Sequence, residues 1–291
     1  MPMHDKTCLV TGASSGIGKA TALGLAHRGA RVALAVRDHG RGEAAADEIR
    51  QRVPGARLDV LTADLTKLSD VRALASRVRD RYRRLDVLVN NAGVVMFHRQ
   101  VTPEGLETTF AANHLGPFLL TNLLRDPLAK SAPARVITVS SSGHKHVRNL
   151  PWNDLSTAQQ FRPLRVYQTT KLLNVLFTAE LSRRLAASGV TANCADPGFV
   201  RTHLGRHATG GFGLFLKITR PFQVSVEAGA ETSIYLASSS EVAEVTGGYF
   251  AKSCPAVPSA LSQDREAAER LWQLSTQLSG LDTEHTIPNP T

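Results

Sequence analysis

Cysteine is scarce in this chain, with three residues among 291, and the three lie far apart. Cys8 and Cys194 fall within strand-like apolar runs, and Cys254 stands near the end. An odd number of widely spaced cysteines argues for reduced, buried thiols and against disulfides or a metal site. His144 and His146 lie two residues apart, but the sequence offers no third ligand, so we interpret them as exposed loop histidines.

Long apolar runs are also lacking. No run reaches the roughly 20 residues that a membrane-spanning helix needs. A strand-like pattern begins within a few residues of the N-terminus, which leaves no room for a signal peptide. We therefore predict a cytoplasmic protein with no integral membrane segment.

Acidic residues are outnumbered, and the formal net charge is +9. Such a charge raises nucleic acid as a partner. The basic residues are spread along the chain, however, and the one short cluster, at 77–84, closes a helical pattern where cations complement the helix dipole. We predict a solvated basic face and no nucleic-acid partner.

Strand-like and helical patterns alternate along the chain. The strand-like runs are 6–11, 31–36, 58–62, 87–89, 135–139, 190–195 and 248–250. The helical patterns follow the first glycine turn to residue 27 and then cover 43–52, 68–82, 103–124, 166–187, 226–237 and 267–278. This rhythm predicts an α/β protein with a single doubly wound (Rossmann) parallel sheet and helices on both faces. With no repeat or linker, residues 1–291 are predicted to form one domain, with 251–291 as a C-terminal extension.

A glycine-rich turn joins the first strand to the first helix. Its spacing is Gly12-x3-Gly16-x-Gly18. Glycines let the backbone approach a pyrophosphate closely, and the N-terminus of the following helix attracts its charge. A purely structural turn is the alternative, but this strand–turn–helix context favours dinucleotide binding.

Tyr167 and Lys171 lie four residues apart in a helical pattern, which places both side chains on one helix face. A neighbouring ammonium lowers the pKa of a phenol. Such a pair can pass a proton to or from an alcohol or carbonyl oxygen. A surface tyrosine beside a surface lysine is the alternative interpretation.

Several motifs, in this order along residues 6–250, resemble those of the short-chain dehydrogenase/reductase family. They are Thr11-Gly12-x3-Gly16-Ile17-Gly18, Asn90-Asn91-Ala92-Gly93, Asn113, Ser140-Ser141, Tyr167-x3-Lys171 and Pro197-Gly198. Three further stretches resemble the retinol-dehydrogenase-like branch, namely His114-Leu115-Gly116, Pro151-Trp152-Asn153-Asp154-Leu155 and Asn174-Val175-Leu176-Phe177. Asp196 departs from that branch, where histidine is common, and this weakens retinol as an expected substrate.

The resemblance implies an oxidoreductase that moves a hydride between a nicotinamide cofactor and the carbonyl or alcohol carbon of a lipophilic small molecule. It implies that Tyr167 is the general acid/base, that Lys171 lowers its pKa and holds the ribose, and that Ser141 positions the substrate oxygen. Asn113 would anchor a water in the proton path, while Ser140 and Ser142 are alternatives to Ser141. The expected cofactor-binding residues are Gly12, Ser14, Ser15, Gly16, Ile17, Gly18, Arg37, Asp64, Leu65, Asn91, Ala92, Gly93, Tyr167, Lys171, Pro197, Gly198, Val200 and Thr202.

NADP is the expected cofactor. Val36 ends the second strand-like run, where an acidic residue would serve NAD, and Arg37 follows it. A guanidinium suits a 2′-phosphate. Asp38 could serve the ribose instead if the register shifts by two. A non-catalytic dinucleotide-sensing or scaffold protein on the same fold is the alternative function.

Two helical segments are apolar most of the way round, which predicts burial on more than one side. Their apolar residues are Leu115, Phe118, Leu119, Leu123, Leu124, Leu172, Val175, Leu176, Leu181 and Leu185. Relatives in the family pair these helices, so a homodimer or homotetramer is expected, unless the C-terminal tail covers them. The apolar stretch 212–222 is interpreted as a substrate lid, with a membrane-surface helix or simple core as alternatives.

Pro117 lies four residues after Asn113 and has no N–H, so the Asn113 carbonyl lacks its usual helical donor. A water that extends the proton path would satisfy that carbonyl. A helix kink or the start of a new helix is an equally good interpretation.

Overall fold

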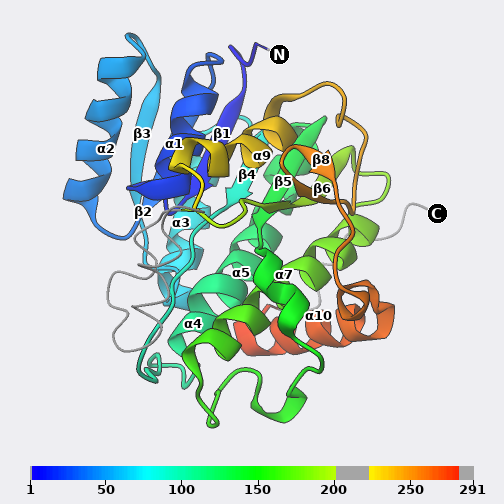
Figure 1. The fold of residues 1–291 in the computed structure, drawn as a ribbon. Helices are drawn as coiled ribbons and strands as arrows, with labels where there is room; N and C mark the ends of the chain where they lie inside the picture. The colour runs from blue at the N-terminus through cyan, green and yellow to red at the C-terminus, as the bar shows by residue number, and fades with distance from the viewer. Residues whose placement is uncertain (1, 201–222, 282–291) are drawn as a thin grey trace.

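The predicted alternation of strands and helices forms one eight-stranded sheet (Figure 1). The computed structural model describes residues 2–200 and 223–281. The strands are β1 Thr7–Thr11, β2 Arg31–Val36, β3 Leu58–Thr62, β4 Val87–Asn90, β5 Ala134–Val139, β6 Val190–Asp196, β7 Tyr249–Ala251 and β8 Cys254–Pro255. Their order is β3-β2-β1-β4-β5-β6-β7-β8, and all neighbours are parallel except β7 and β8. The predicted Rossmann-type fold is confirmed, with β8 as an antiparallel addition.

Helices cover both faces of the sheet. On one face lie α1 Gly16–Ala26, α2 His39–Arg52 and α9 Val226–Ser238. On the other lie α3 Leu68–Arg81, α5 Gly116–Leu123 and α7 Pro163–Arg184. The remaining segments are α4 Thr108–Phe110, η1 Ala111–Leu115, α6 Arg125–Lys130, η2 Ser142–His146, η3 Trp152–Asp154, η6 Ala260–Gln263 and α10 Arg265–Ser279.

The central strands β1 and β4 are buried along their whole length because helices cover both faces of the sheet. In β1, Leu9 contributes to the hydrophobic core beneath α3, α5 and α7. Its neighbours Cys8 and Val10 contribute to the core beneath α1, α2 and α9. Successive side chains of a strand point to opposite faces, so one short apolar run supplies both cores.

The predicted helical region 103–124 is not one regular helix. Residues 103–107 are not helical, and from residue 108 the region consists of α4, the π-helical turn η1 and α5, which follow one another without a break in helical backbone angles. In η1 the Gly116 N–H donates to the Ala111 carbonyl, five residues earlier rather than four. The hydrophobic pattern does not distinguish a π-turn from an α-turn, because it reports only which side of the helix is buried.

The C-terminal extension covers the two apolar helices. Figure 1 shows α10 against α5 and α7, on the side away from the sheet. Trp272 of α10 lies 5.0 Å from the Phe118 ring and 5.9 Å from the Phe177 ring, measured between ring centroids. The apolar faces that favoured a dimer are therefore buried within one chain, as the alternative interpretation held. Assembly stays a prediction, but these faces no longer require a second copy.

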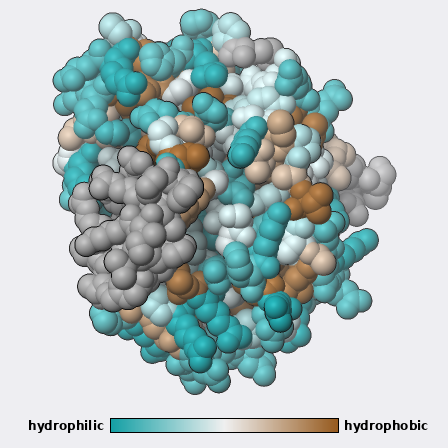
Figure 2. Space-filling view, in the orientation of Figure 1, coloured by the Kyte–Doolittle hydropathy of each residue, from teal (hydrophilic) through white to brown (hydrophobic). Residues whose placement is uncertain are grey.

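The surface of the described residues carries scattered hydrophobic side chains. On the face in Figure 2, hydrophobic residues form small separate areas among hydrophilic ones. Cys8 and Cys194 are buried as expected, but Cys254 is exposed because it lies on the edge strand β8. None of the helices in the described ranges is long and apolar enough to cross a membrane. The predicted lid, 212–222, lies outside those ranges.

Candidate active site

The glycine turn lies at the carboxyl end of β1, beside β4, where the strand order reverses. Ligands of doubly wound sheets bind at such a switch point. Gly12 and Gly16 adopt φ values of 67° and 56°, which favour glycine. A Cβ on Gly18 would lie 2.3 Å from the Gly12 carbonyl oxygen, so only glycine fits there. Ser15 precedes α1 without a side-chain hydrogen bond to it, which leaves the helix N-terminus available to an anion.

The Asn91-Ala92 stretch is bound to the end of β1. The backbone N–H groups of Asn91 and Ala92 each donate to the Thr11 hydroxyl at 3.0 Å. The Asn91 side-chain amide donates to the Thr11 carbonyl at 2.8 Å. Asn91 therefore fixes the loop after β4 next to the glycine turn, a structural contribution that the motif alone does not show.

Three other expected cofactor residues lie at the carboxyl ends of β2 and β3. Arg37 is exposed and directly follows β2. Asp38 is the N-cap of α2, and its side chain accepts the Arg41 N–H at 2.9 Å. Asp64 accepts the N–H and the hydroxyl of Thr66, and the neighbouring Leu65 is buried.

Asn113 lies in the π-turn η1 and is fully buried. Its Oδ1 accepts the Val94 N–H at 2.7 Å, and its Nδ2 donates to the Val94 carbonyl at 2.9 Å and to Thr170 Oγ1 at 3.1 Å. The side chain thus ties the loop after β4 to α7. Pro117, the second residue of α5, cannot donate to the Asn113 carbonyl, which agrees with the wider turn. Pro117 therefore stands in the first turn of a new α-helical segment that follows the π-turn, as the alternative interpretation held.

Lys171 is buried in α7, and its Nζ donates to the Val139 carbonyl at the end of β5, at 3.0 Å. Gly93 lies next to it, since a Cβ on Gly93 would be 3.5 Å from both Lys171 Nζ and Asn113 Oδ1. Burial lowers the pKa of Lys171 to about 8, although the nearby Cys194 and Asp196 oppose this shift. The structure therefore brings Gly93, Asn113 and Lys171 together as the motifs predicted.

Tyr167 and Lys171 share one face of α7, with the ammonium 5.6 Å from the centre of the tyrosine ring. We expected this ammonium to lower the pKa of Tyr167, but the shift has the opposite direction. Burial raises the pKa of Tyr167 to about 12, a hydrogen bond with the Ser141 side chain opposes this, and the Asp196 charge adds to it. Desolvation of the phenolate is the largest cause of this shift. At neutral pH Tyr167 is therefore a phenol.

Of the three neighbouring serines, only Ser141 is suited to act with Tyr167. Ser140 is buried and donates its hydroxyl to the Lys171 carbonyl at 2.8 Å. Ser142 is exposed. Ser141 Oγ accepts the Gly143 N–H at 3.1 Å, which leaves its own proton free to be donated.

Strand β6 ends with a buried carboxylate, Asp196. Asp196 accepts the Tyr249 hydroxyl at 2.5 Å and the Gly198 N–H at 2.9 Å. Pro197 is half-buried, and Val200 pairs with Val224 in an isolated bridge. Thr202, another expected cofactor residue, lies outside the described ranges.

His144 is the main correction to the site. We expected an exposed loop histidine, but its side chain has no exposed surface. Its imidazole bonds to the Ser141 carbonyl and to Ser259 of the C-terminal extension, and burial lowers its pKa. His146 is exposed as predicted. Within 2–200 and 223–281, no group of three His, Cys, Asp or Glu side chains is arranged to hold a metal ion.

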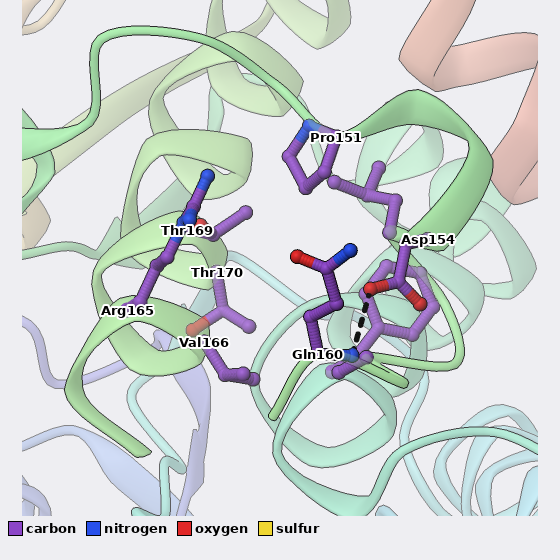
Figure 3. A pocket seen from close by; sticks show the side chains of 10 residues that line it. Pro151, Asp154, Gln160, Arg165, Val166, Thr169 and Thr170 are labelled. Atoms are coloured by element: carbon purple, nitrogen blue, oxygen red, sulfur yellow. Dashed lines mark hydrogen bonds between the residues drawn. The ribbon is translucent and has the colours of Figure 1, made fainter. Parts of the chain in front are cut away.

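A pocket opens beside α7, between its N-terminal turns and the loop 151–160 (Figure 3). Apolar atoms of Phe110, Leu155 and Val166 line it together with polar groups of Asp154 and Arg165. Tyr167, Ser141 and Lys171 are not among its lining residues. Thr170 connects the pocket with the candidate catalytic residues. It lines the pocket, and its Oγ1 accepts a hydrogen bond from the Asn113 side-chain amide.

A family model for short chain dehydrogenases matches residues 6–210. The chain belongs to this family. It is 42% identical to human retinol dehydrogenase 13 over 295 residues, covering 98% of this chain and 88% of that protein.

Solved structures of the family share the fold. An uncharacterised protein from Mycobacterium paratuberculosis is 34% identical, with a TM-score of 0.77 and 96% of both chains covered. A protein from Beutenbergia cavernae, described as an NAD(P)-dependent gluconate 5-dehydrogenase and carrying bound NADP, is 27% identical. Its TM-score is 0.71, and the match covers 87% of this chain and 97% of that one.

As a short-chain dehydrogenase, the chain is an oxidoreductase that uses a nicotinamide dinucleotide to interconvert alcohols and carbonyl compounds. The residues present fit such a cofactor. The glycine turn lets a pyrophosphate approach the backbone closely, and Ser15 does not cap the N-terminus of α1 with its side chain. Gly93 has no side chain to fill the space beside Lys171.

Proposed function

We propose that this short-chain dehydrogenase is NADP-dependent and acts on the carbonyl or alcohol carbon of a lipophilic small molecule. We assign the chemistry to Asn113, Ser141, Tyr167 and Lys171. One observation carries this proposal: the Ser141 side chain interacts with the Tyr167 phenol, and the buried Lys171 ammonium lies beside Asn113 and Gly93, 5.6 Å from the centre of the Tyr167 ring. A dinucleotide sensor or scaffold would have no need of this buried acid/base group.

When bound, the dinucleotide supplies or accepts the hydride, and the protein handles the proton. In the reducing direction Ser141 donates a hydrogen bond to the carbonyl oxygen of the substrate, and Tyr167 transfers its phenol proton to that oxygen. The Lys171 ammonium stabilises the tyrosinate that remains, and it would also hold the ribose of a bound cofactor. The Asn113 amide anchors the loop after β4 beside Lys171, and a water at the π-turn completes the proton path.

NADPH oxidation with a panel of lipophilic ketones and aldehydes tests this function. We expect turnover with members of the panel, and we expect the retinoid aldehyde to be among the candidates because relatives bear the name retinol dehydrogenase. Tight NADPH binding without turnover of any compound would support the sensor alternative instead. We expect the substrate preference of this protein to differ from that of these relatives. The reason is the buried Asp196, whose charge acts on Tyr167.

Arg37→Ala should weaken NADPH binding by about 10- to 100-fold and leave NADH binding nearly unchanged. A hydrogen-bonded charge pair contributes about 1.5–3 kcal/mol, and only NADPH offers the 2′-phosphate to the guanidinium. Asp38 does not compete for the ribose in this arrangement, because it caps α2. Nucleotide fluorescence titration gives both dissociation constants without any turnover.

Arg52→Ala is the matched control, since it removes the same charge from the exposed last residue of α2. If both variants lost the same NADPH affinity, the effect of Arg37 would come from the general positive potential of the surface and not from a contact with the 2′-phosphate. Equal affinity of the wild type for NADPH and NADH would contradict NADP preference.

The pH dependence should separate the two directions of the reaction. Because the pKa of Tyr167 is raised to about 12, the phenol that reduction needs is fully present at pH 6 to 7.5. We expect kcat/KM for carbonyl reduction to stay flat over this range. Oxidation needs the tyrosinate, whose fraction grows about tenfold per pH unit below the pKa, so kcat/KM for alcohol oxidation should rise in that proportion.

A fall in kcat/KM for reduction with a midpoint below pH 7 would contradict this direction of shift, because Lys171, whose pKa is about 8, is still an ammonium there. It would show that Lys171 lowers the pKa of Tyr167 in the working enzyme.

We further propose a cytoplasmic protein that has no integral membrane segment and binds no nucleic acid. Two cations of the short basic cluster support this view, because Arg81 bonds to Asp59 and Arg84 bonds to Asp86. Both acids are buried, so these arginines serve the fold. Retention of the protein by DNA or RNA at physiological salt would contradict the proposal.

A further inference from the structure

His144 joins two parts of the chain that are far apart in sequence. Its Nδ1 lies 2.7 Å from the Ser141 carbonyl oxygen, and the Ser259 N–H donates to its Nε2 at 3.1 Å. The ring also lies 5.1 Å from the Tyr249 ring, between centroids. One buried imidazole thus contacts the residue that acts with Tyr167, the strand β7 and the C-terminal extension.

These two hydrogen bonds determine the tautomer of His144. A backbone N–H can only donate, so Nε2 must be the unprotonated acceptor. Nδ1 then carries the proton and donates it to the Ser141 carbonyl. Both ring nitrogens are satisfied, as a fully buried polar side chain requires.

We propose that His144 is a positioning residue, which holds the Ser141 main chain in the conformation that directs its hydroxyl at Tyr167, and which anchors this conformation to Ser259. This inference rests on the proposed function, because it assigns a use to the position of Ser141. The tyrosine, the lysine and the serine come from α7 and the end of β5. His144 connects them to Ser259 of the C-terminal extension.

The geometry around Ser141 explains why such a support matters. Ser141 is the N-cap of the short 3-10 helix η2, and its Oγ accepts the Gly143 N–H. The same turn carries His144, whose N–H donates to the Ser141 carbonyl at 3.1 Å. The carbonyl therefore receives two hydrogen bonds from His144, one from its backbone and one from its side chain. Loss of the side-chain bond would let the peptide plane of Ser141 rotate and move the hydroxyl.

A purely structural role is the rival explanation, in which His144 only fills space beside Tyr249. Two substitutions separate the explanations, because each retains one of the two bonds. In His144→Asn the side-chain amide N–H can take the place of Nδ1 and still donate to the Ser141 carbonyl. In His144→Gln the amide oxygen can take the place of Nε2 and still accept from Ser259, while the donor to Ser141 is lost.

We expect His144→Asn to keep kcat for reduction within about threefold of wild type and His144→Gln to lower it by about 10- to 100-fold. A misplacement of about 1 Å at a reacting group costs on the order of 100-fold in rate. The dissociation constant of NADPH should be unchanged in both, since His144 lies on the Ser141 side of the site. His146→Gln, at an exposed position in the same turn, is the control and should behave as wild type.

Equal kcat in the two His144 variants, whether retained or lost, would overturn the positioning role, as would loss in the Asn variant alone. ¹⁵N NMR of the wild-type imidazole is the second measurement and needs no variant. It should show a protonated Nδ1 and an unprotonated Nε2, and the reverse tautomer would also overturn the inference. An inactive wild type would instead refute the proposed function, so the two failures are distinguishable.

Discussion

Tyr167→Phe is expected to lower kcat for carbonyl reduction by about 10²- to 10⁴-fold, the range that a general acid contributes. The dissociation constant of NADPH should stay within about twofold of wild type. The substitution removes only the hydroxyl, which interacts with the Ser141 side chain, and leaves the ring beneath Lys171. Steady-state kinetics of NADPH oxidation and a fluorescence titration of NADPH give the two quantities.

Tyr235→Phe is the matched control for the loss of a phenol hydroxyl. Its hydroxyl donates to Glu241 on the surface, at the end of α9 and away from the site. We expect this variant to keep wild-type kinetics. If Tyr167→Phe kept activity within a few-fold of wild type, Tyr167 would not be the acid.

Trp272→Ala should cost about 3–5 kcal/mol in the free energy of unfolding, as large-to-small substitutions of buried aromatic residues do. Trp272 is 8% exposed and holds α10 against Phe118 and Phe177. The Arg184 guanidinium also lies 4.4 Å from the centre of its ring. Chemical denaturation followed by far-UV circular dichroism measures the loss.

Trp152→Ala is the control, because these two are the only tryptophans of the chain. Trp152 is half-buried in η3 and lies beneath Arg270, so we expect a loss nearer 1 kcal/mol. A loss for Trp272→Ala no greater than that for Trp152→Ala would show that α10 does not stabilise the domain as the packing indicates. A dimer that forms through α5 and α7 would also be inconsistent with a covered face, and light scattering tests that.

The sheet could be predicted from local patterns, because strands buried on both faces are short, continuous apolar runs. The limits of β2 and β3 agree with the predicted ranges, and β5 and β6 differ by one residue. The π-turn at 111–115 and the packing of α10 were not predictable in this way. The packing of α10 depends on contacts between residues distant in sequence, such as the bond between His114 Nε2 and Ser275 Oγ at 2.9 Å.

In the candidate site, too, local motifs were predictable and long-range contacts were not. Tyr167 and Lys171 were recognisable from their spacing on one helix, and Ser141 and Asn113 from the motifs. The direction of the pKa shift at Tyr167 was not, because burial and the Asp196 charge come from packing. His144 seemed a loop residue because Ser259, which covers it, returns 115 residues later in the chain.

Direct transfer of a labelled hydride tests the central claim. NADPH deuterated at the reactive C4 position is incubated with the protein and a lipophilic ketone, and the product is analysed by mass spectrometry. We expect an alcohol with one deuterium on the carbinol carbon from the wild type, and a strongly reduced yield from Tyr167→Phe. Tight binding of NADPH with no labelled alcohol from any carbonyl compound would contradict an acid/base site at Tyr167 and would favour a dinucleotide sensor.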